Sequence, residues 1–256
     1  MRWSDEGIVL AARRHGESAL LVHLLTREHG RHAGLVRGGQ RPKARGAWQI
    51  GNILAVTWNA RLAEHLGLLQ GEPIAGYAAR FIADRLRLAC LAAAAAVAEA
   101  TLPEREAHPR AHAGLAALLA ALARDAGWAA DYVRWELDLL AELGFGLDLA
   151  RCAATGTTED LVYVSPRSGQ AVSATAGARY RDRLLAFPPF LHAAESNAEP
   201  SLQDVLDGLA LTGFFLERRV LVPQNRKLPP ARSRFVDALG RFAIESAGAV
   251  KPIGVA

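Results

Sequence analysis

Six basic side chains fall within nineteen residues of the chain, and they are Arg27, Arg31, Arg37, Arg41, Lys43 and Arg45. The same stretch contains one acid, Glu28. Gly38-Gly39 and Pro42 interrupt its second half, so the pattern predicts a strand that runs into a basic, Gly-rich loop. Such a loop suits a phosphodiester backbone better than a small-molecule pocket. The alternative is a solvated surface loop, which is what most charge runs are.

The excess positive charge of the whole chain lies in its first quarter. Residues 1–72 contain ten Lys or Arg and six Asp or Glu, and residues 73–256 contain 20 of each, from totals of 30 and 26. A polyanion site is therefore expected within residues 1–72. Trp48 and Trp58 follow the basic segment and could either stack on bases or pack in a core. The sequence leaves both alternatives open.

Residue patterns that carry catalysis are missing from the sequence. It has no Walker loop, no nucleophile elbow, no paired-histidine zinc motif and no Gly-rich dinucleotide fingerprint, so we expect a protein that is not an enzyme and needs no cofactor. His29 and His32 lie three apart without further ligands, and we expect them to add to the cationic surface rather than to bind a metal. Cys90 and Cys152 fit neither a disulfide nor a zinc spacing, and Cys152 is expected to be structural.

Five short segments near the N-terminus have the alternation and β-branched content of strands, and they are residues 7–11, 18–26, 31–37, 49–58 and 66–74. Gly-containing turns separate them, which predicts a small barrel or sandwich. A five-stranded oligonucleotide-binding (OB) barrel is the version that also explains the charge.

The remainder of the chain has the composition of helices, with predicted segments at residues 77–101, 109–125, 128–143, 176–185, 201–219 and 231–246. Ser201 and Asp204 have the spacing of a capping box, and Trp128, Tyr132 and Trp135 form a stripe expected in a core. A β-hairpin is expected at about residues 151–173. The predicted fold is α+β, with an OB-fold domain at residues 1–76 followed by a helical domain at 77–256 that carries this hairpin.

No apolar run is long enough to span a bilayer and no signal peptide is present, so we expect a soluble, cytoplasmic protein.

Several motifs occur in an order that resembles the RecO family of bacterial recombination mediators. Near the N-terminus they are residues 5–10, 14–17, 25–30 and Val36-Arg37-Gly38-Gly39, and later they are residues 143–145, 151–152, 164–169 and 228–232. The resemblance runs nearly end to end. It implies an OB barrel, a helical domain, and a non-enzymatic role in recombinational repair at the nucleoid.

The resemblance also implies partners and contact residues. RecO proteins bind single- and double-stranded DNA, anneal complementary strands, and act with RecR on SSB-coated DNA to load RecA. Carried to this chain, the expected DNA contacts are Arg14, Arg31, Arg37, Arg41, Lys43 and Arg45. The alternative is a docking adaptor that mainly binds RecR and the C-terminal tail of SSB. Many members have a four-cysteine zinc element where this chain has residues 151–173, and here only Cys152 remains, so no metal is expected.

Overall fold

A computed structural model describes residues 1–124, 126–192 and 199–249, together with all their side chains except those of Lys43 and residues 246–249. The chain forms two compact units, Met1–Asp125 and Ala126–Ala256. The expected domain boundary after residue 76 stays a prediction. Within the described ranges, no helix has both the length and the apolar character that a membrane span requires.

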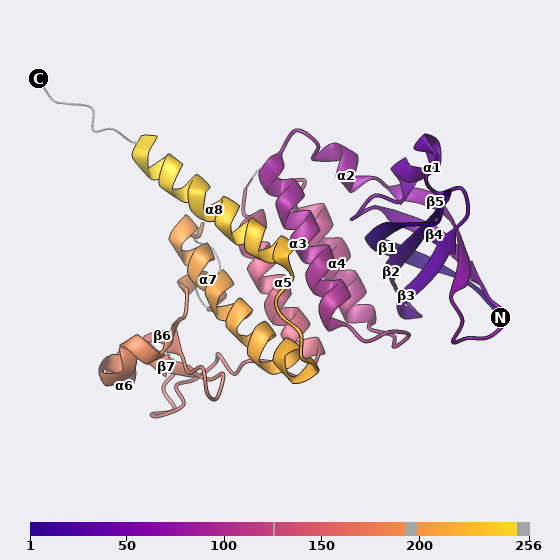
Figure 1. The fold of residues 1–256 in the computed structure, drawn as a ribbon. Coiled ribbons are helices and arrows are strands. Elements are labelled where there is room, and N and C mark those ends of the chain that lie inside the picture. Colours follow the sequence, from indigo (N-terminus) through magenta and orange to yellow (C-terminus); the bar gives the residue numbers. More distant parts are fainter. Residues whose placement is uncertain (125, 193–198, 250–256) are drawn as a thin grey trace, which may run out of the picture. The chain divides into compact units, whose positions relative to one another are not determined.

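The first unit begins with a closed five-stranded barrel of strand order β1-β2-β3-β5-β4 (Figure 1). Its elements are β1 (Arg2–His15), β2 (Ala19–Thr26), β3 (Gly30–Val36), α1 (Pro42–Ala47), β4 (Ile53–Asn59) and β5 (Gly67–Ala75). The first half of β1 pairs with β4 and its second half with β2, and an irregularity between Val9 and Ala11 lies near the change of partner. Because bulges bend a strand, β1 can belong to both sides of the closure. The predicted barrel is confirmed.

Trp48 and Trp58 are core residues of the barrel, with 4% and 0% of their surfaces exposed. They pack with Val9, Val22 and Leu54 in one apolar cluster. The indole Nε1 of Trp58 also donates to the carbonyl of Ala33 at 3.2 Å. Base stacking by these two residues, which the sequence left open, is therefore wrong, since both side chains are almost wholly buried.

Helices complete the first unit: α2 (Tyr77–Arg80), α3 (Arg85–Thr101) and α4 (Pro109–Ala121). The sequence predicted one helix over residues 77–101, and this is wrong at Phe81–Asp84. Asp84 caps α3 because its carboxylate accepts from the backbone N–H groups of Leu86 and Arg87 at 3.1 and 3.0 Å. Phe81 is buried just before this cap. A cap and a buried aromatic side chain thus divide an Ala-rich segment whose composition alone favours one helix.

The second unit is largely helical and carries a small three-stranded sheet of order β7-β6-β8. Its elements are α5 (Trp128–Glu142), β6 (Leu161–Val164), β7 (Ala171–Ser173), α6 (Ala174–Gly177), a 3-10 helix (Ala178–Arg183), β8 (Leu185–Ala186), a 3-10 turn (Pro189–Leu191), α7 (Leu202–Phe215), a π-helical turn (Leu216–Leu221), a 3-10 turn (Val222–Gln224) and α8 (Pro230–Ala249). The predicted hairpin is present and gains the third strand, β8. The helix predicted over 176–185 is present as the end of α6 and the 3-10 helix up to Arg183, and it is wrong only after that, because Leu185–Ala186 pair with β6 instead.

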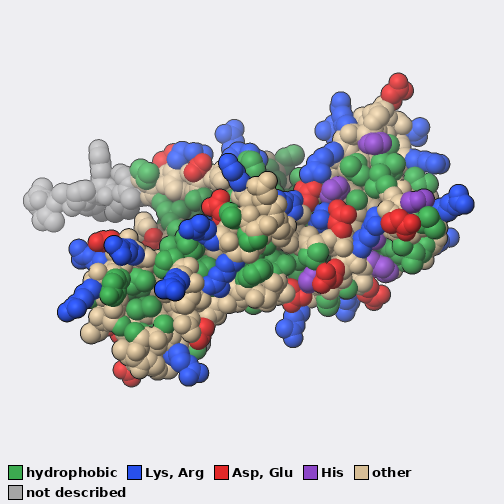
Figure 2. Space-filling view, turned by 60° about the horizontal axis from the view of Figure 1, so that its bottom comes forward, with side chains coloured by type: hydrophobic (Ala, Val, Ile, Leu, Met, Phe, Trp, Pro, Cys, Tyr) green, Lys and Arg blue, Asp and Glu red, His purple; other side chains and the backbone are tan. Residues whose placement is uncertain are grey.

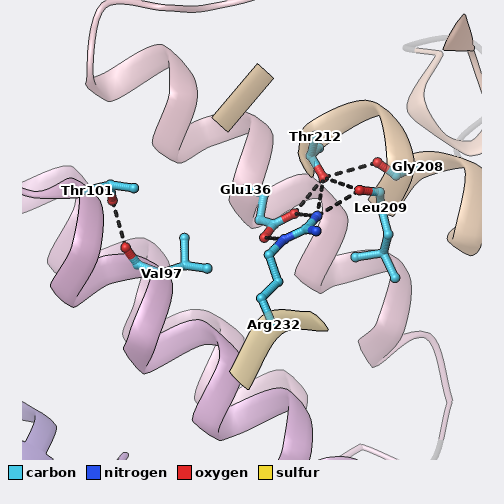
Figure 3. Close-up of polar contacts among 7 residues, drawn as sticks. All are labelled: Val97, Thr101, Glu136, Gly208, Leu209, Thr212 and Arg232. Carbon is cyan, nitrogen blue, oxygen red and sulfur yellow. Dashed lines mark hydrogen bonds and ion pairs between the residues drawn. The ribbon is translucent and has the colours of Figure 1, made fainter. Parts of the chain in front are cut away.

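A helix cap and a buried ion pair stabilise the helices of the second unit. The capping box at Ser201 and Asp204 is confirmed, with the Ser201 hydroxyl accepting from the Asp204 N–H at 3.1 Å. Arg232 on α8 forms a buried ion pair with Glu136 on α5, and Thr212 on α7 donates to the same carboxylate at 2.5 Å (Figure 3). Three helices therefore meet at one polar cluster inside an apolar core.

Candidate nucleic-acid interface

Gln40 joins the β1–β2 turn to the segment that follows β3 and carries Arg37 and Arg41. Its side-chain Nε2 donates to the carbonyls of Gly16 and Ala19 at 3.0 and 2.9 Å, and its backbone N–H donates to the carbonyl of Ser18 at 3.1 Å. The β1–β2 turn and the segment after β3 are therefore held together at one end of the barrel. The bonds bring the strand end that carries Arg14 next to the segment that carries Arg37 and Arg41.

Gly38 and Gly39 shape the start of this segment. Gly38 has a φ of +65°, a conformation that glycine adopts without the strain other residues incur. The side chain of Arg41 lies over it, since a Cβ at Gly38 would be 3.6 Å from Arg41 Nε. Gly39 packs so closely on Leu20 that a Cβ there would lie 3.0 Å from the Leu20 side chain. The two glycines thus allow a turn that packs closely on the barrel and leaves the Arg41 side chain exposed.

The expected basic loop is wrong in its second half, where residues Pro42–Ala47 form the short helix α1. Pro42 opens it, as suits the first turn of a helix. Trp48 fixes its other end in the core, and the indole lies so close to Gly71 that a Cβ there would be 2.8 Å from the ring. The Asn52 amide donates to the carbonyls of Gly46 and Ala47, both at 3.1 Å. Arg45 is therefore presented from an anchored element.

Four of the expected arginines, Arg14, Arg37, Arg41 and Arg45, are exposed at this end of the barrel. Among the described residues none of them forms an ion pair. We call this set the barrel-end arginines. Figure 2 shows Lys and Arg side chains spread over the barrel on the right of that view. Lys43, the fifth expected contact here, has its side chain outside the described part of the structure.

Arg31 is placed elsewhere by its hydrogen bonds. Its Nε donates to the carbonyl of Leu102 at 2.8 Å, and its Nη1 lies 3.0 Å from a Glu104 carboxylate oxygen. The side chain is 13% exposed. Arg31 thus joins β3 to the segment between α3 and α4, and the structure does not bring it together with the barrel-end arginines.

Helix α3 covers part of the outer face of β1 and β2. Glu99 accepts from Arg13 at 2.7 Å and lies 2.9 Å from His23 Nδ1. Burial raises the pKa of Glu99, but the contacts with His23 and Arg13 outweigh burial and lower it. The carboxylate is therefore charged and closes this face with an ion-pair cluster. Arg14, Arg37, Arg41 and Arg45 lie outside this cluster, at the end of the barrel formed by the β1–β2 turn and α1.

His29 and His32 do not form a shared site. His29 Nδ1 lies 3.0 Å from an Asp5 carboxylate oxygen, and its ring stacks on Trp3 at 4.1 Å. His32 is 6% exposed and meets the rings of Trp3 and Trp58 edge to face. Burial disfavours its imidazolium form and lowers its pKa. The prediction that His32 adds to the cationic surface is therefore wrong, because the side chain is buried and neutral at physiological pH.

Cys152 lies in the segment at residues 151–173, for which the sequence predicts no metal. Its sulfur accepts from the backbone N–H and the hydroxyl of Ser173 at 3.3 and 3.5 Å. Burial raises the pKa of the thiol, but these bonds and one from Thr155 outweigh it, lowering the pKa to about 6. One sulfur with hydroxyl neighbours does not supply the four ligands of a structural zinc. No group of three or more His, Cys, Asp or Glu side chains that could hold a metal occurs among the described residues.

Sequence reasoning missed two features of the interface. Gln40 and Asn52 position it through amide bonds to backbone carbonyls, and a lone amide beside a Gly pair gives no signal of a partner 24 residues away. Arg61 is exposed on the β4–β5 loop. That loop and the β1–β2 loop are the ones through which OB folds contact oligonucleotides. An isolated arginine has no spacing pattern, so only the fold identifies Arg61 as a candidate contact.

A closed five-stranded barrel of this strand order, followed by a largely helical part, gives the chain the architecture of the OB-fold class. Sequence comparison then gives the family. Residues 1–77 match the family described as Recombination protein O N terminal, and residues 82–229 match Recombination protein O C terminal. This chain belongs to the RecO family, whose members are non-enzymatic recombination mediators, and it is a DNA repair protein involved in recombinational repair.

Individual relatives are similar over nearly their whole length. The DNA repair protein RecO of Rhodospirillum rubrum is 51% identical over 248 residues, which cover 95% of this chain and 98% of the relative. The protein of the same name from Rhodospirillum centenum is 52% identical over 239 residues, which cover 93% and 94%. That of Phenylobacterium zucineum is 50% identical over 239 residues, which cover 93% and 98%.

Proposed function

We propose that the chain binds single- and double-stranded DNA at the barrel end and anneals complementary strands there. The observation that supports this is the Gln40 link, because it brings the unpaired arginine at the end of β1 and those of the segment after β3 to one surface. Arg14, Arg37, Arg41 and Arg45 contact phosphates, together with Lys43. Arg31 is not included, since its guanidinium is engaged by Leu102 and Glu104.

Phosphate neutralisation accounts for both binding and annealing. Two complementary strands repel each other through their backbones, and a surface of several arginines reduces this repulsion while leaving base edges available for pairing. Contacts of this kind do not read sequence. In recombinational repair the same activity would serve the loading of RecA on SSB-coated DNA together with RecR. No surface of this chain is assigned to RecR.

The test removes three arginines from α1 and the preceding loop. In Arg37→Ala/Arg41→Ala/Arg45→Ala, the slope of log affinity against log salt on duplex DNA should fall by about 0.9 per lost phosphate contact, and annealing should slow. Affinity should fall alike for unrelated sequences. A matched control, Arg2→Ala/Arg85→Ala/Arg110→Ala, removes three exposed arginines from the same unit. An unchanged slope in the first variant, or an equal loss in the control, would reject the barrel end as the DNA site.

A second candidate function, docking of a partner's acidic tail, is favoured by a groove within the first unit. The groove has a volume of about 470 Å³ and is lined by apolar side chains of the barrel and of α2 and α3, including Trp48, Ile50, Ile82, Leu88 and Leu91. Arg45 also lines it. A tail that ends in an apolar residue, as we propose for SSB, would place that side chain in the groove and its carboxylate on Arg45.

A peptide titration separates this candidate from DNA binding. An acidic peptide with a C-terminal Phe should bind the full chain saturably, and its C-terminally amidated form should bind more weakly because it lacks the carboxylate. Ile82→Asp should abolish binding, since the side chain is 77% exposed and lines the groove. Ile74→Asp, at an exposed position of β5 that does not line the groove, serves as the control. Equal binding of both peptide forms would contradict the role given to Arg45.

A further inference from the structure

The 3-10 helix of the second unit, Ala178–Arg183, presents an exposed tyrosine among three exposed arginines. Tyr180 is 57% exposed, which is unusual for a large ring, and it makes no ring contact with other described residues. Arg179, Arg181 and Arg183 flank it and are all exposed. Asp182 is the one acid in this helix, and it lies 3.6 Å from Arg181 with its side chain 91% exposed. The helix therefore keeps a net charge of +2.

Both ends of this helix are fixed to the three-stranded sheet. At its start, Gly177 packs on Tyr163 so closely that a Cβ would lie 2.6 Å from the ring. At its end, Leu185 pairs with Val164 of β6. This register brings Arg183 to the same end of the sheet as the β6–β7 turn, which carries the exposed Arg167. The exposed side chains are thus carried by a backbone whose course is set by packing and pairing.

The charge of the surrounding lobe has the same sign. Residues 151–186 contain five arginines and three acids. Lys and Arg side chains are spread over the lobe of β6, β7 and α6, at the lower left of Figure 2. Arg219 differs from the arginines of the 3-10 helix because its guanidinium lies over the Phe215 ring at 4.6 Å and is used in packing. We therefore define the second surface by Arg167, Arg179, Tyr180, Arg181 and Arg183.

We infer that this second surface binds single-stranded nucleic acid. Arginines supply phosphate contacts, and an exposed tyrosine supplies a face on which an unpaired base stacks. A duplex hides its base faces, so it would use the charges alone. The inference extends the proposed function, because a chain with one cationic surface on each of its two units can hold two strands at once. That arrangement would supply an annealing protein with both of its substrates.

Binding of a fluorescently labelled oligothymidine to the full chain tests the surface. Arg179→Ala/Arg183→Ala should lower the salt slope by about 0.7 for each lost contact on a single strand. Tyr180→Ala should weaken single-strand binding by about five-fold, the lower end for loss of one stacked base, with the salt slope and duplex affinity unchanged. Tyr180→Phe keeps the ring and should bind normally. The matched control Arg234→Ala/Arg241→Ala removes two exposed charges from α8.

Three outcomes would overturn the inference. They are a single-strand affinity that Tyr180→Ala does not change, a salt slope that Arg179→Ala/Arg183→Ala does not change, and an equal effect of the α8 control. A surface that serves an acidic protein instead would give the first two. Failure of the barrel-end triple variant to weaken binding would reject the proposed function but not this surface, because each set is replaced separately. All substituted positions are exposed, and thermal unfolding of each variant checks that the fold is retained.

Discussion

Arg232 and Glu136 form a bidentate ion pair that is almost completely withdrawn from water. The Nε–Oε1 and Nη2–Oε2 distances are 2.7 and 2.8 Å, and the two side chains are 6% and 0% exposed. Burial disfavours the charged form of Arg232, but the Glu136 carboxylate outweighs this and raises the pKa of the guanidinium. Nη2 also donates to the carbonyl of Leu209 at 2.7 Å. The pair therefore joins α5, α7 and α8 through one satisfied cluster (Figure 3).

Arg232→Ala should lower the free energy of unfolding by about 3–5 kcal/mol, because it leaves the Glu136 charge buried without its partner. Chemical denaturation of the full chain measures this. Arg234→Ala, two residues along the same helix and exposed, should change stability by less than about 0.5 kcal/mol. Replacing both partners, as in Arg232→Met/Glu136→Leu, should recover much of the loss, since no charge then remains unpaired. A double variant as unstable as the single one would contradict this account.

Gln40→Ala should weaken DNA binding although it removes no charge. The amide bonds to Gly16 and Ala19 hold the β1–β2 turn against the segment that carries Arg37, and loss of bonds of about 1 kcal/mol each would let the two loops separate. Affinity should fall about two- to five-fold, and amide hydrogen exchange should rise at Gly16–Ala19. Gln70→Ala, exposed on β5, is the matched control. Faster exchange without loss of affinity would show that the link is structural only.

Much of the fold follows from local patterns in the sequence. Alternation of apolar residues predicts all five barrel strands, and the spacing of Ser201 and Asp204 predicts the start of α7. The positions that the sequence left open or predicted wrongly have a common physical cause. Trp48 is a core residue because of its close contact with Gly71, and α2 ends before Asp84 because of a cap and the burial of Phe81. Tertiary packing decides such positions, and periodicity reports only the neighbours along the chain.

The candidate site was predictable in part for the same reason. Clustering of basic residues identifies the segment that carries Arg37, Arg41 and Arg45, because charge density is a local property. Which arginines remain unpaired depends on acids far away in the chain. Glu104 engages Arg31 from 73 residues away, and Glu99 engages Arg13 from 86 residues away. Ion pairs between residues so far apart in the chain can be identified only once the fold is known.

His32 should make the first unit less stable in mild acid. Its pKa is lowered from an ordinary value of 6.5, chiefly by burial and also by the charges of Arg105 and His29, while a hydrogen bond with the His29 backbone and the charge of Glu104 oppose this shift. Because the unfolded chain then binds more protons than the folded one, the stability from neutral His32 is present above about pH 6.5 and is lost as the pH falls below it. The free energy of unfolding measured by urea should therefore drop between pH 7.5 and pH 5.5.

His32→Phe should reduce that drop, leaving the part due to His112, whose pKa is also lowered by burial. His65→Phe, exposed on the β4–β5 loop, should leave it unchanged. A drop of equal size in His32→Phe would show that His32 does not govern the acid sensitivity of the barrel.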